Sequence, residues 1–424
     1  MKKAAQYFLA LEPFALAVIL LAFWTPNLDR VHTLWLIVPF IVVRVLVSRR
    51  VIPASPLNPI LIILLVLAVI NLSVARFSWG AWIIGRPLMG IILATSFADW
   101  ARRWGETAFD RTLLATALLG LLVGVVALFW SQWVIGSKSA ALQPIIDALP
   151  PAPTGAIVET FIGGGFNVNE IAGGMSWLLP VVAVIALLDW QQRANAVRRW
   201  VATLAFIALS LAIFLGQSRA AIAGVLIVLA GISVLLIRPG WTRRIWWIAL
   251  AAVTAFEVGL LSGVFSSAPD MIQERDEASV NSRLLIWQAG IDIVIDYPLT
   301  GIGMNKFRAA EVRAIYPVEG YATQVLPHAH NEFLQVSTDL GLPGLGVFIG
   351  LYGVTFWMLY KRWRSGSRIA VGIAAGLGAH LIFGMLDAVT LFDRFIYVFW
   401  WLIGLAMSLE ALSQRFIEKS SQKG

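Results

Sequence analysis

Two of the four histidines, His328 and His330, lie close together in an otherwise mostly apolar chain. Asn331 follows them, and Gly341 ends a short stretch in which apolar residues recur with helical spacing. The start of such a helix presents free backbone N–H groups and the positive end of the helix dipole, with Asn331 or His330 as its first residue. The segment therefore places an imidazole, which titrates near neutral pH, beside a helix start that favours anions.

Three arginines favour an anionic ligand, most naturally a phosphate or pyrophosphate. Arg219 lies where two apolar stretches meet, Arg283 falls on the apolar face of an expected helix, and Arg86 falls inside another apolar stretch. At ~1.5 Å per residue Arg86 would lie about 10 Å inside a membrane. A guanidinium there costs roughly 2.5–3.5 kcal/mol unless it lines a polar cavity. Arginines at an interface are also common anchors, which is the interpretation preferred for Arg30, Arg76 and Arg394.

Other groups are less suggestive of chemistry. His328 and His330 could simply be polar residues that cap a helix at the interface, and His32 and His380 are interpreted as structural. Glu274 and Asp276 could bind a divalent cation, but Arg275 separates them and no histidine is near, so a solvated loop is preferred and no metal is expected. Cysteine is absent, which excludes disulfides and thiolate metal sites.

The composition indicates the class of protein that must position these residues. The 424 residues are 59% hydrophobic and only 13% charged, with 19 tryptophans, which soluble domains of this size do not show. The apolar runs are too long for strands of a transmembrane barrel. The fold class is thus an all-α polytopic membrane protein. The net charge of +8 is attributed to topology, so no nucleic-acid partner is expected.

A spanning helix needs about 20 mostly apolar residues, and by that criterion the chain has about twelve spans. The amino-terminal run resembles a signal peptide but lacks a small-residue cleavage site, so it is interpreted as a retained span. The expected spans are 8–24, 33–48, 57–75, 79–100, 112–131, 170–189, 199–216, 219–237, 246–265, 340–360, 369–387 and 395–411.

Most lysines and arginines fall in the loops on one side of these spans, which the positive-inside rule assigns to the cytoplasm together with both termini. Residues 1–424 then form a single integral membrane domain with two long outer loops, 132–169 and 266–339, and the histidines lie in the second. In that loop the pattern predicts a helix over 279–297, with Arg283, Trp287, Gly290, Ile291 and Val294 on one face. It also predicts a helical piece over 305–316. Tyr297-Pro298 ends the first helix, and Gly301-Ile302-Gly303 forms a turn.

These motifs together resemble the superfamily of O-antigen ligases and O-antigen polymerase-like membrane glycosyltransferases. His330-Asn331, nine further residues and Gly341-Leu342 match the ligase pattern of His-(Asn/Ser/Gln), nine residues and Gly-(Leu/Thr). Asn281-Ser282-Arg283 with Trp287, the segment from Tyr297 to Gly303, and Ser218-Arg219 at a span boundary are also similar. The resemblance extends over the whole topology of about twelve spans and one large late outer loop, a GT-C-like architecture.

The resemblance implies transfer of a glycan from undecaprenyl pyrophosphate to a lipid A–core sugar, at the periplasmic face of a bacterial inner membrane. The implied reaction inverts the anomeric centre and needs no metal or other cofactor. His330 is the implied base or orienting group, because displacement at an anomeric carbon benefits from a base on the attacking hydroxyl. Arg219, Arg283 and Arg86 would stabilise the pyrophosphate, and Asn331, His328 and Trp287 would contact substrate.

Three alternatives stay open. His330-Asn331-Glu332 is also compatible with protein O-oligosaccharyltransferases, which usually carry an additional carboxyl-terminal domain, and polysaccharide polymerases belong to the same superfamily. A transporter of lipid-linked anions would predict duplicated halves with broken helices at the membrane centre. The halves here are dissimilar, and the informative polar residues gather at the outer mouth.

Overall fold

A computed structural model gives the fold. It describes residues 2–12, 15–16, 36–48, 53–76, 81–131, 133, 142–150, 165–193, 195–261, 269–321, 326–389, 391–393 and 395–421. Within these residues the chain is helical and contains no strand, apart from a single bridge between Ser131 and Phe166. The all-α prediction is confirmed for them.

The helices follow the apolar stretches of the sequence closely. The amino-terminal half contains α1 (Lys2–Leu9), α3 (Val38–Ser48), α4 (Asn58–Val74), η2 (Ala81–Ile84), α5 (Gly85–Trp104), α6 (Glu106–Trp130), α8 (Gln143–Asp147) and α10 (Val168–Gln192). The remainder contains α11 (Ala196–Gly216), α12 (Arg219–Leu236), α13 (Trp241–Leu261), α14 (Pro269–Asp296), α15 (Ala310–Ile315), α16 (Glu332–Arg364), α17 (Ile369–Gly384) and α18 (Ile396–Ser421).

Six of the described helices are long and apolar enough to cross a membrane: α6, α10, α11, α12, α16 and α18. Shorter apolar helices include α4 and α17. The chain is therefore consistent with a polytopic membrane protein, and the number of about twelve spans stays a prediction. Each expected span from 33–48 onward overlaps a helix, whereas most of the span expected over 8–24 lies outside the described residues.

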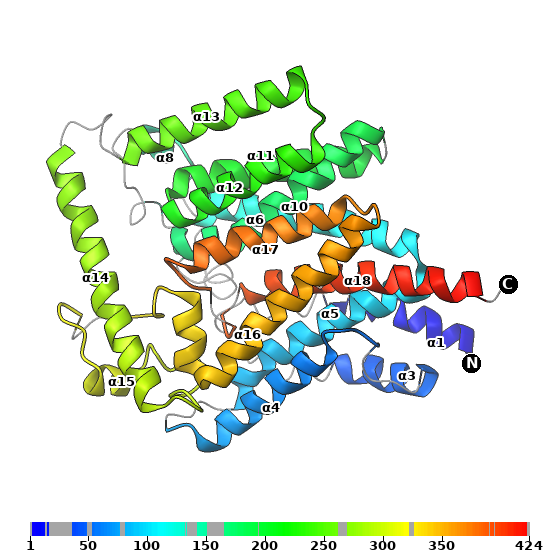
Figure 1. The fold of residues 1–424 in the computed structure, drawn as a ribbon, viewed down its shortest axis with the longest axis horizontal. Coiled ribbons are helices and arrows are strands. Elements are labelled where there is room, and N and C mark those ends of the chain that lie inside the picture. Colours follow the sequence, from blue (N-terminus) through cyan, green and yellow to red (C-terminus); the bar gives the residue numbers. More distant parts are fainter. Residues whose placement is uncertain are drawn as a thin grey trace.

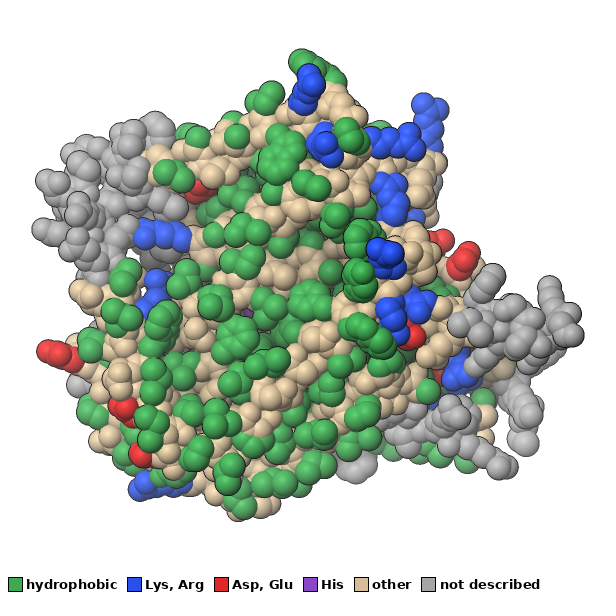
Figure 2. All heavy atoms as spheres, in the orientation of Figure 1, with side chains coloured by type: hydrophobic (Ala, Val, Ile, Leu, Met, Phe, Trp, Pro, Cys, Tyr) green, Lys and Arg blue, Asp and Glu red, His purple; other side chains and the backbone are tan. Residues whose placement is uncertain are grey.

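The long helices form a bundle, with the chain termini at one end (Figure 1). α5 packs on α18, α6 on α11, and α17 on both α10 and α12. α1 and the carboxyl end of α18 lie at one end of the bundle, and α14 and α15 lie at the other. Hydrophobic side chains cover the middle of the face in Figure 2, with Lys and Arg gathered mainly toward the end that holds the termini. That distribution is the one expected for a helix bundle with a basic cytoplasmic end.

A close helix contact brings the start of α12 and the end of α17 to the same level of the bundle. A Cβ on Gly224 of α12 would lie 2.5 Å from the carbonyl oxygen of Ala379 in α17, so only glycine allows this approach. Arg219 and Gly384 each lie five residues from that contact toward the end of their helix, which is about 7–8 Å at 1.5 Å per residue. The start of α12 and the end of α17 are therefore level with each other.

A second, smaller core lies in the segment from α14 to the start of α16. Ile286 and Ile293 of α14 pack with Phe307, Val312 of α15 and Leu326. Asn71 of α4 fixes this unit to the bundle, because its Nδ2 donates to the carbonyl oxygens of Thr300 (2.7 Å) and Asp339 (2.9 Å) and its Oδ1 accepts the Met304 N–H (3.1 Å). The side-chain amide of Asn71, in a mostly apolar helix, thus anchors the segment that follows α14.

Four local expectations were wrong. α14 begins at Pro269, ten residues before the expected start, and Ile291 is exposed because the buried face of α14 is formed by Ile286, Ala289, Gly290 and Ile293. The helix expected over 305–316 covers only Ala310–Ile315, since Asn305 adopts a left-handed backbone conformation (φ 59°). Arg86 lies in the first turn of α5 and not deep within a helix, because α5 begins only at Gly85.

Candidate active site

The two histidines share one carboxylate. Nδ1 of His330 lies 3.1 Å from Oδ1 of Asp387, and Nε2 of His328 lies 3.5 Å from the same oxygen. The two imidazole rings meet edge to face, with 4.4 Å between their centroids. If Nδ1–H of His330 donates to Asp387, the other ring nitrogen, Nε2, carries a lone pair that can accept a proton. This is the arrangement of a general base oriented by a carboxylate.

Burial and neighbouring charges shift the pKa values of His328 and Asp387. Burial lowers the pKa of His328 to about 4, against the opposing effect of Asp387, so His328 is neutral at neutral pH. Burial alone would raise the pKa of Asp387. The hydrogen bond from His330 and the charges of both imidazoles outweigh burial and hold that pKa well below its usual range. Asp387 is therefore ionised throughout the physiological pH range.

Local backbone chemistry fixes the position of His330. It has a left-handed backbone (φ 48°), which is uncommon outside glycine and occurs at functional sites. The next residue, Asn331, begins α16 as predicted, because its side chain accepts the Leu334 N–H at 3.0 Å. The indole N–H of Trp287, from α14, donates to the carbonyl oxygen of His330 at 3.2 Å. His330 is held from both sides.

The segment that carries Asp387, residues 385–393 between α17 and α18, is tied to the start of α16. Asn331 donates to the carbonyl oxygen of Met385 at 3.1 Å. Glu332 is 1% exposed, and its Oε2 accepts the Val389 N–H at 2.8 Å. A Cβ on Gly384 would lie 2.9 Å from Cβ of Glu332, so the glycine permits this close packing. His330, Asn331 and Glu332 thus all contact the 385–393 segment.

Gly341 ends the first part of α16 with a kink, as the sequence predicted. Its φ of 71° is outside the helical region, and a Cβ there would lie 2.6–2.8 Å from backbone atoms of Pro298 and Leu299. Leu342 N–H donates to the carbonyl oxygen of Pro298 at 2.7 Å. The nine residues between Asn331 and Gly341 therefore form a short helix whose two ends are both anchored: at the histidines, and at the chain that follows α14.

The predicted arginines come from three different helices. Arg219 begins α12, whose N-cap is Ser218 and which follows Gln217 in a left-handed conformation (φ 47°). Arg283 precedes Trp287 by four residues and so lies on the same side of α14, one turn away. Arg86 donates through Nη1 to the carbonyl oxygen of Phe392, in the segment that carries Asp387. Arg86 thus supports this segment, and its predicted contact with substrate stays a prediction.

Sequence reasoning missed Asp387 and Arg308. Asp387 was placed at the end of an apolar span, although an acid beside Met385-Leu386 at the outer end of a helix was a usable signal. Arg308 is close enough that its charge lowers the pKa of His328, although burial, Asp387, His330 and Asp393 all have larger effects. It lies between Phe307 and the start of α15, where nothing in the sequence distinguishes it from its basic neighbours.

His328, His330 and Asp387 could also bind a metal ion. Each offers one ligand atom, and these atoms lie within 4.8 Å of one another. Two imidazoles and a carboxylate suit Zn²⁺ best. The same nitrogen of His330 cannot both bind a metal and hydrogen-bond to Asp387. Glu274 and Asp276, the other metal candidate, lie on α14, where their side chains are outside the described residues.

A comparison with protein families bears on this site. Residues 204–349 match the family model described as O-antigen ligase. Over these residues the chain is similar to that family. No curated protein matches the chain.

The O-antigen ligase-like region covers roughly a third of the chain, from α11 through the first half of α16. It contains Arg219, Arg283, His328 and His330. Asp387 and Arg86 lie outside it, on the α17–α18 connection and on α5. The family suggests O-antigen ligase or polymerase-type function, and with it a glycosyltransferase-like activity on lipid-linked glycans.

Proposed function

We propose that the chain is an O-antigen ligase. In this proposal it transfers a glycan from undecaprenyl pyrophosphate to a sugar of lipid A–core at the periplasmic face of the bacterial inner membrane. Both termini are then cytoplasmic. The observation that carries the proposal is the contact of 3.1 Å between Nδ1 of His330 and Oδ1 of Asp387, inside a region that matches the O-antigen ligase family.

The proposed reaction is a single displacement with inversion. Nε2 of His330 takes the proton from the acceptor hydroxyl as that oxygen bonds to the anomeric carbon of the donor glycan. The bond from that carbon to the pyrophosphate oxygen breaks on the opposite face, and the pair of electrons leaves with the pyrophosphate. Asp387 stabilises the resulting imidazolium, whereas His328, which is neutral, adds no competing charge.

The leaving pyrophosphate needs positive charge and no proton. Arg219 stands at the start of α12, where free backbone N–H groups and the helix dipole favour an anion. Arg283 stands one turn from Trp287, which contacts the His330 backbone. We assign both arginines to the pyrophosphate, with Arg86 as a further contact and with Asn331, His328 and Trp287 beside the sugars. This placement supports a reaction that needs no metal.

A transfer assay tests the proposal. Purified protein in detergent receives undecaprenyl-pyrophosphate-linked glycan and lipopolysaccharide that lacks O-antigen. We expect labelled lipopolysaccharide from the wild type and none from His330→Ala, whose folding is checked by thermal unfolding. Lengthening of the lipid-linked glycan without labelled lipopolysaccharide would make the protein a polymerase. Labelled protein acceptors would make it an O-oligosaccharyltransferase, and movement of donor without a covalent product would make it a transporter.

The arginines are tested by donor saturation in the same assay. Arg219→Ala and Arg283→Ala should raise the donor concentration needed for half-maximal rate, by about tenfold or more for a lost charge-assisted contact. Arg76→Ala is the matched control, because Arg76 is an outer arginine that donates to the Tyr297 hydroxyl at 2.9 Å. Unchanged donor saturation in both arginine variants would remove them from pyrophosphate binding.

A further inference from the structure

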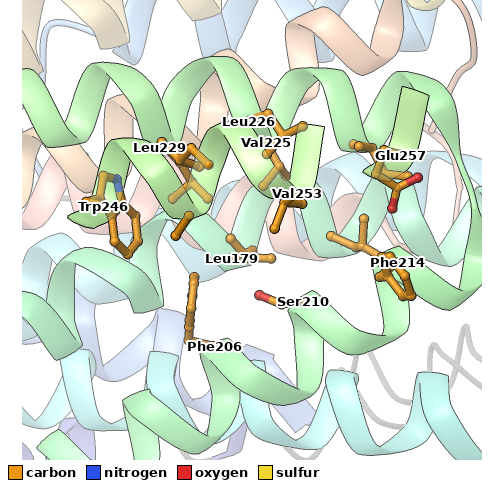
Figure 3. A pocket seen from close by; sticks show the side chains of 14 residues that line it. Leu179, Phe206, Ser210, Phe214, Val225, Leu226, Leu229, Trp246, Val253 and Glu257 are labelled. Atoms are coloured by element: carbon orange, nitrogen blue, oxygen red, sulfur yellow. The ribbon is translucent and has the colours of Figure 1, made fainter. Parts of the chain in front are cut away.

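An apolar cavity lies between α13 and the helices that precede it (Figure 3). Its volume is about 310 Å³, and its lining comes from α10, α11, α12 and α13. Trp246 stands at one end and Glu257 at the other, with Phe206 and Ser210 between them on α11. None of its lining residues belongs to the His330 site, so the cavity is a separate feature of the fold.

The shape of the cavity suits one hydrocarbon chain. Trp246 and Glu257 are eleven residues apart on α13, which corresponds to about 16 Å along the helix. The facing residues on α12 run from Ile222 to Leu229. α13 exposes Ile248 (66%) and Val258 (58%) on its other side. The slot is therefore long and narrow, and it lies beside an exposed apolar surface of α13.

Glu257 is the charged residue type among these lining residues, which are otherwise apolar apart from Ser210. It is 3% exposed, and its Oε2 has no hydrogen-bond partner among the residues that the structure describes. The stacked rings of Phe214 and Phe256, with centroids 5.8 Å apart, lie beside it. A buried carboxyl group without a partner is unfavourable. A ligand that brings a hydrogen-bond donor to this end of the slot would satisfy it.

The Glu257 end of the slot faces the start of α12. α12 and α13 are joined by a short turn over 237–240, so the start of α12 and the end of α13 lie at the same end of the pair. Ile222 lines the slot, and Arg219 lies one turn before it on α12. A lipid in the slot would thus place its head toward the arginine that we assign to phosphate chemistry.

We propose that this slot binds one acyl chain of the acceptor lipid, a chain that carries a hydroxyl near its head and bonds it to Glu257. A hydroxyl is uncharged and can both donate and accept, so it can enter an apolar slot and satisfy the carboxyl group. The inference rests on the proposed function, in which the acceptor is lipid A–core, because hydroxylated acyl chains anchor that lipid.

Two other lipids fit less well. A polyprenyl pyrophosphate has its charged group directly on the chain and no hydroxyl, so to reach Glu257 it would carry that charged group into the apolar slot, which is unfavourable. The amine of an aminophospholipid lies beyond its phosphate. To reach Glu257 it would carry that phosphate into the apolar slot, which is unfavourable.

Binding of two matched lipids to the full-length protein in detergent tests the proposal. Both are N-acylated glucosamine phosphates, one with a β-hydroxymyristoyl chain and the other with a myristoyl chain, and binding is measured by native mass spectrometry. We expect the hydroxylated lipid to bind about tenfold more tightly, as expected for one additional hydrogen bond. Glu257→Leu should remove this preference, and Glu257→Gln, which still accepts a hydrogen bond, should keep part of it.

A second pair of variants separates the slot from the rest of α13. Ala249→Phe fills the slot and should weaken both lipids, whereas Val258→Phe, on the exposed side of the same helix, should leave both unchanged. Equal binding of the two lipids by the wild type, or a preference that survives in Glu257→Leu, would overturn the proposal. The proposal would also be overturned if undecaprenyl phosphate displaced the hydroxylated lipid from the wild type but did not displace it from Ala249→Phe, in which the slot is filled. This experiment measures binding and not glycan transfer, so its result can be interpreted even if the ligase assay fails.

Discussion

Nδ1 of His330 and Oδ1 of Asp387 lie 3.1 Å apart although 57 residues separate them in the chain. His330 immediately precedes the cap of α16, and Asp387 follows the end of α17. The contact therefore depends on the packing of α16 against α17. Two helix ends, rather than a local motif, create the candidate base.

Asp387→Asn tests the charge in this contact. Asn keeps an oxygen that can accept from Nδ1–H of His330 and from the Ala388 N–H, which bonds to Asp387 at 3.0 Å. It loses the negative charge that would stabilise an imidazolium, so we expect kcat to fall about 10²-fold or more with little change in donor KM. Asp292→Asn is the control, since Asp292 accepts only from the exposed Gln288 amide. A wild-type kcat in Asp387→Asn would reduce Asp387 to a structural role.

Glu332→Gln and Glu332→Ala test how the 385–393 segment is held. Gln retains an acceptor for the Val389 N–H, whereas Ala leaves that buried N–H without its partner. We expect Glu332→Gln to keep most of the activity and Glu332→Ala to lower kcat about tenfold or more, because Asp387 would no longer be fixed. Saturation kinetics for both variants provide the measurement. Equal losses in the two variants would show that the charge of Glu332 matters rather than its hydrogen bond.

The sequence was informative wherever a local rule decides structure. Asn331 caps α16 and Gly341 breaks it, because a cap and a left-handed glycine depend on neighbouring residues only. The end of α14 before Tyr297-Pro298 follows from the same kind of rule. Helix positions followed from the length of apolar runs, and six of the described helices are long and apolar enough to cross a membrane.

The parts that were missed depend on tertiary packing. Nothing near Asp387 in the sequence indicates that the end of α17 meets the start of α16. The need for glycine at Gly384 and Gly224 is evident only from the atoms of other helices that pack against them. Arg86 was expected well inside a span because hydropathy windows extend across η2, which is a short 3-10 helix before α5 begins. Asn71 appeared to be one polar residue in an apolar helix, and its three partners come from residues more than 200 positions away.

Metal removal tests the choice between a base and a metal site. We expect transfer to continue after treatment with EDTA, because the proposed mechanism uses the arginines for the pyrophosphate. Added Zn²⁺ should inhibit, since His328, His330 and Asp387 offer ligand atoms within 4.8 Å of one another. Activity that is lost with EDTA and restored by Mg²⁺ would contradict the mechanism and return attention to Glu274 and Asp276.

The free energy of unfolding should decrease as the pH is lowered, because the pKa of His328 is lower in the folded protein than in the unfolded chain. Its pKa is about 4 in the folded protein and 6.5 in the unfolded chain, so between these values the unfolded state binds the extra proton. Stability is therefore complete above pH 6.5 and is lost as pH falls toward 4, by at most about 3 kcal/mol. Asp387, whose pKa is depressed, adds a loss only below its ordinary value of 3.8. Thermal unfolding of wild type and His328→Gln across this range should show a flatter profile for the variant, and parallel profiles would refute the assignment.

Gly341→Ala tests the kink that separates the short helix after Asn331 from the rest of α16. The backbone at Gly341 (φ 71°, ψ −174°) is accessible essentially to glycine alone and costs an alanine about 1–3 kcal/mol. Its Cβ would also lie 2.6–2.8 Å from backbone atoms of Pro298 and Leu299, which cannot move as a side chain could. We expect a lower midpoint of thermal unfolding and a lower kcat, because α16 and the chain after α14 would have to separate. Gly346→Ala, in the same helix with no atom within 4 Å of the added Cβ, should leave both unchanged. If the two variants behave alike, the contact between Gly341 and Pro298 does not position His330.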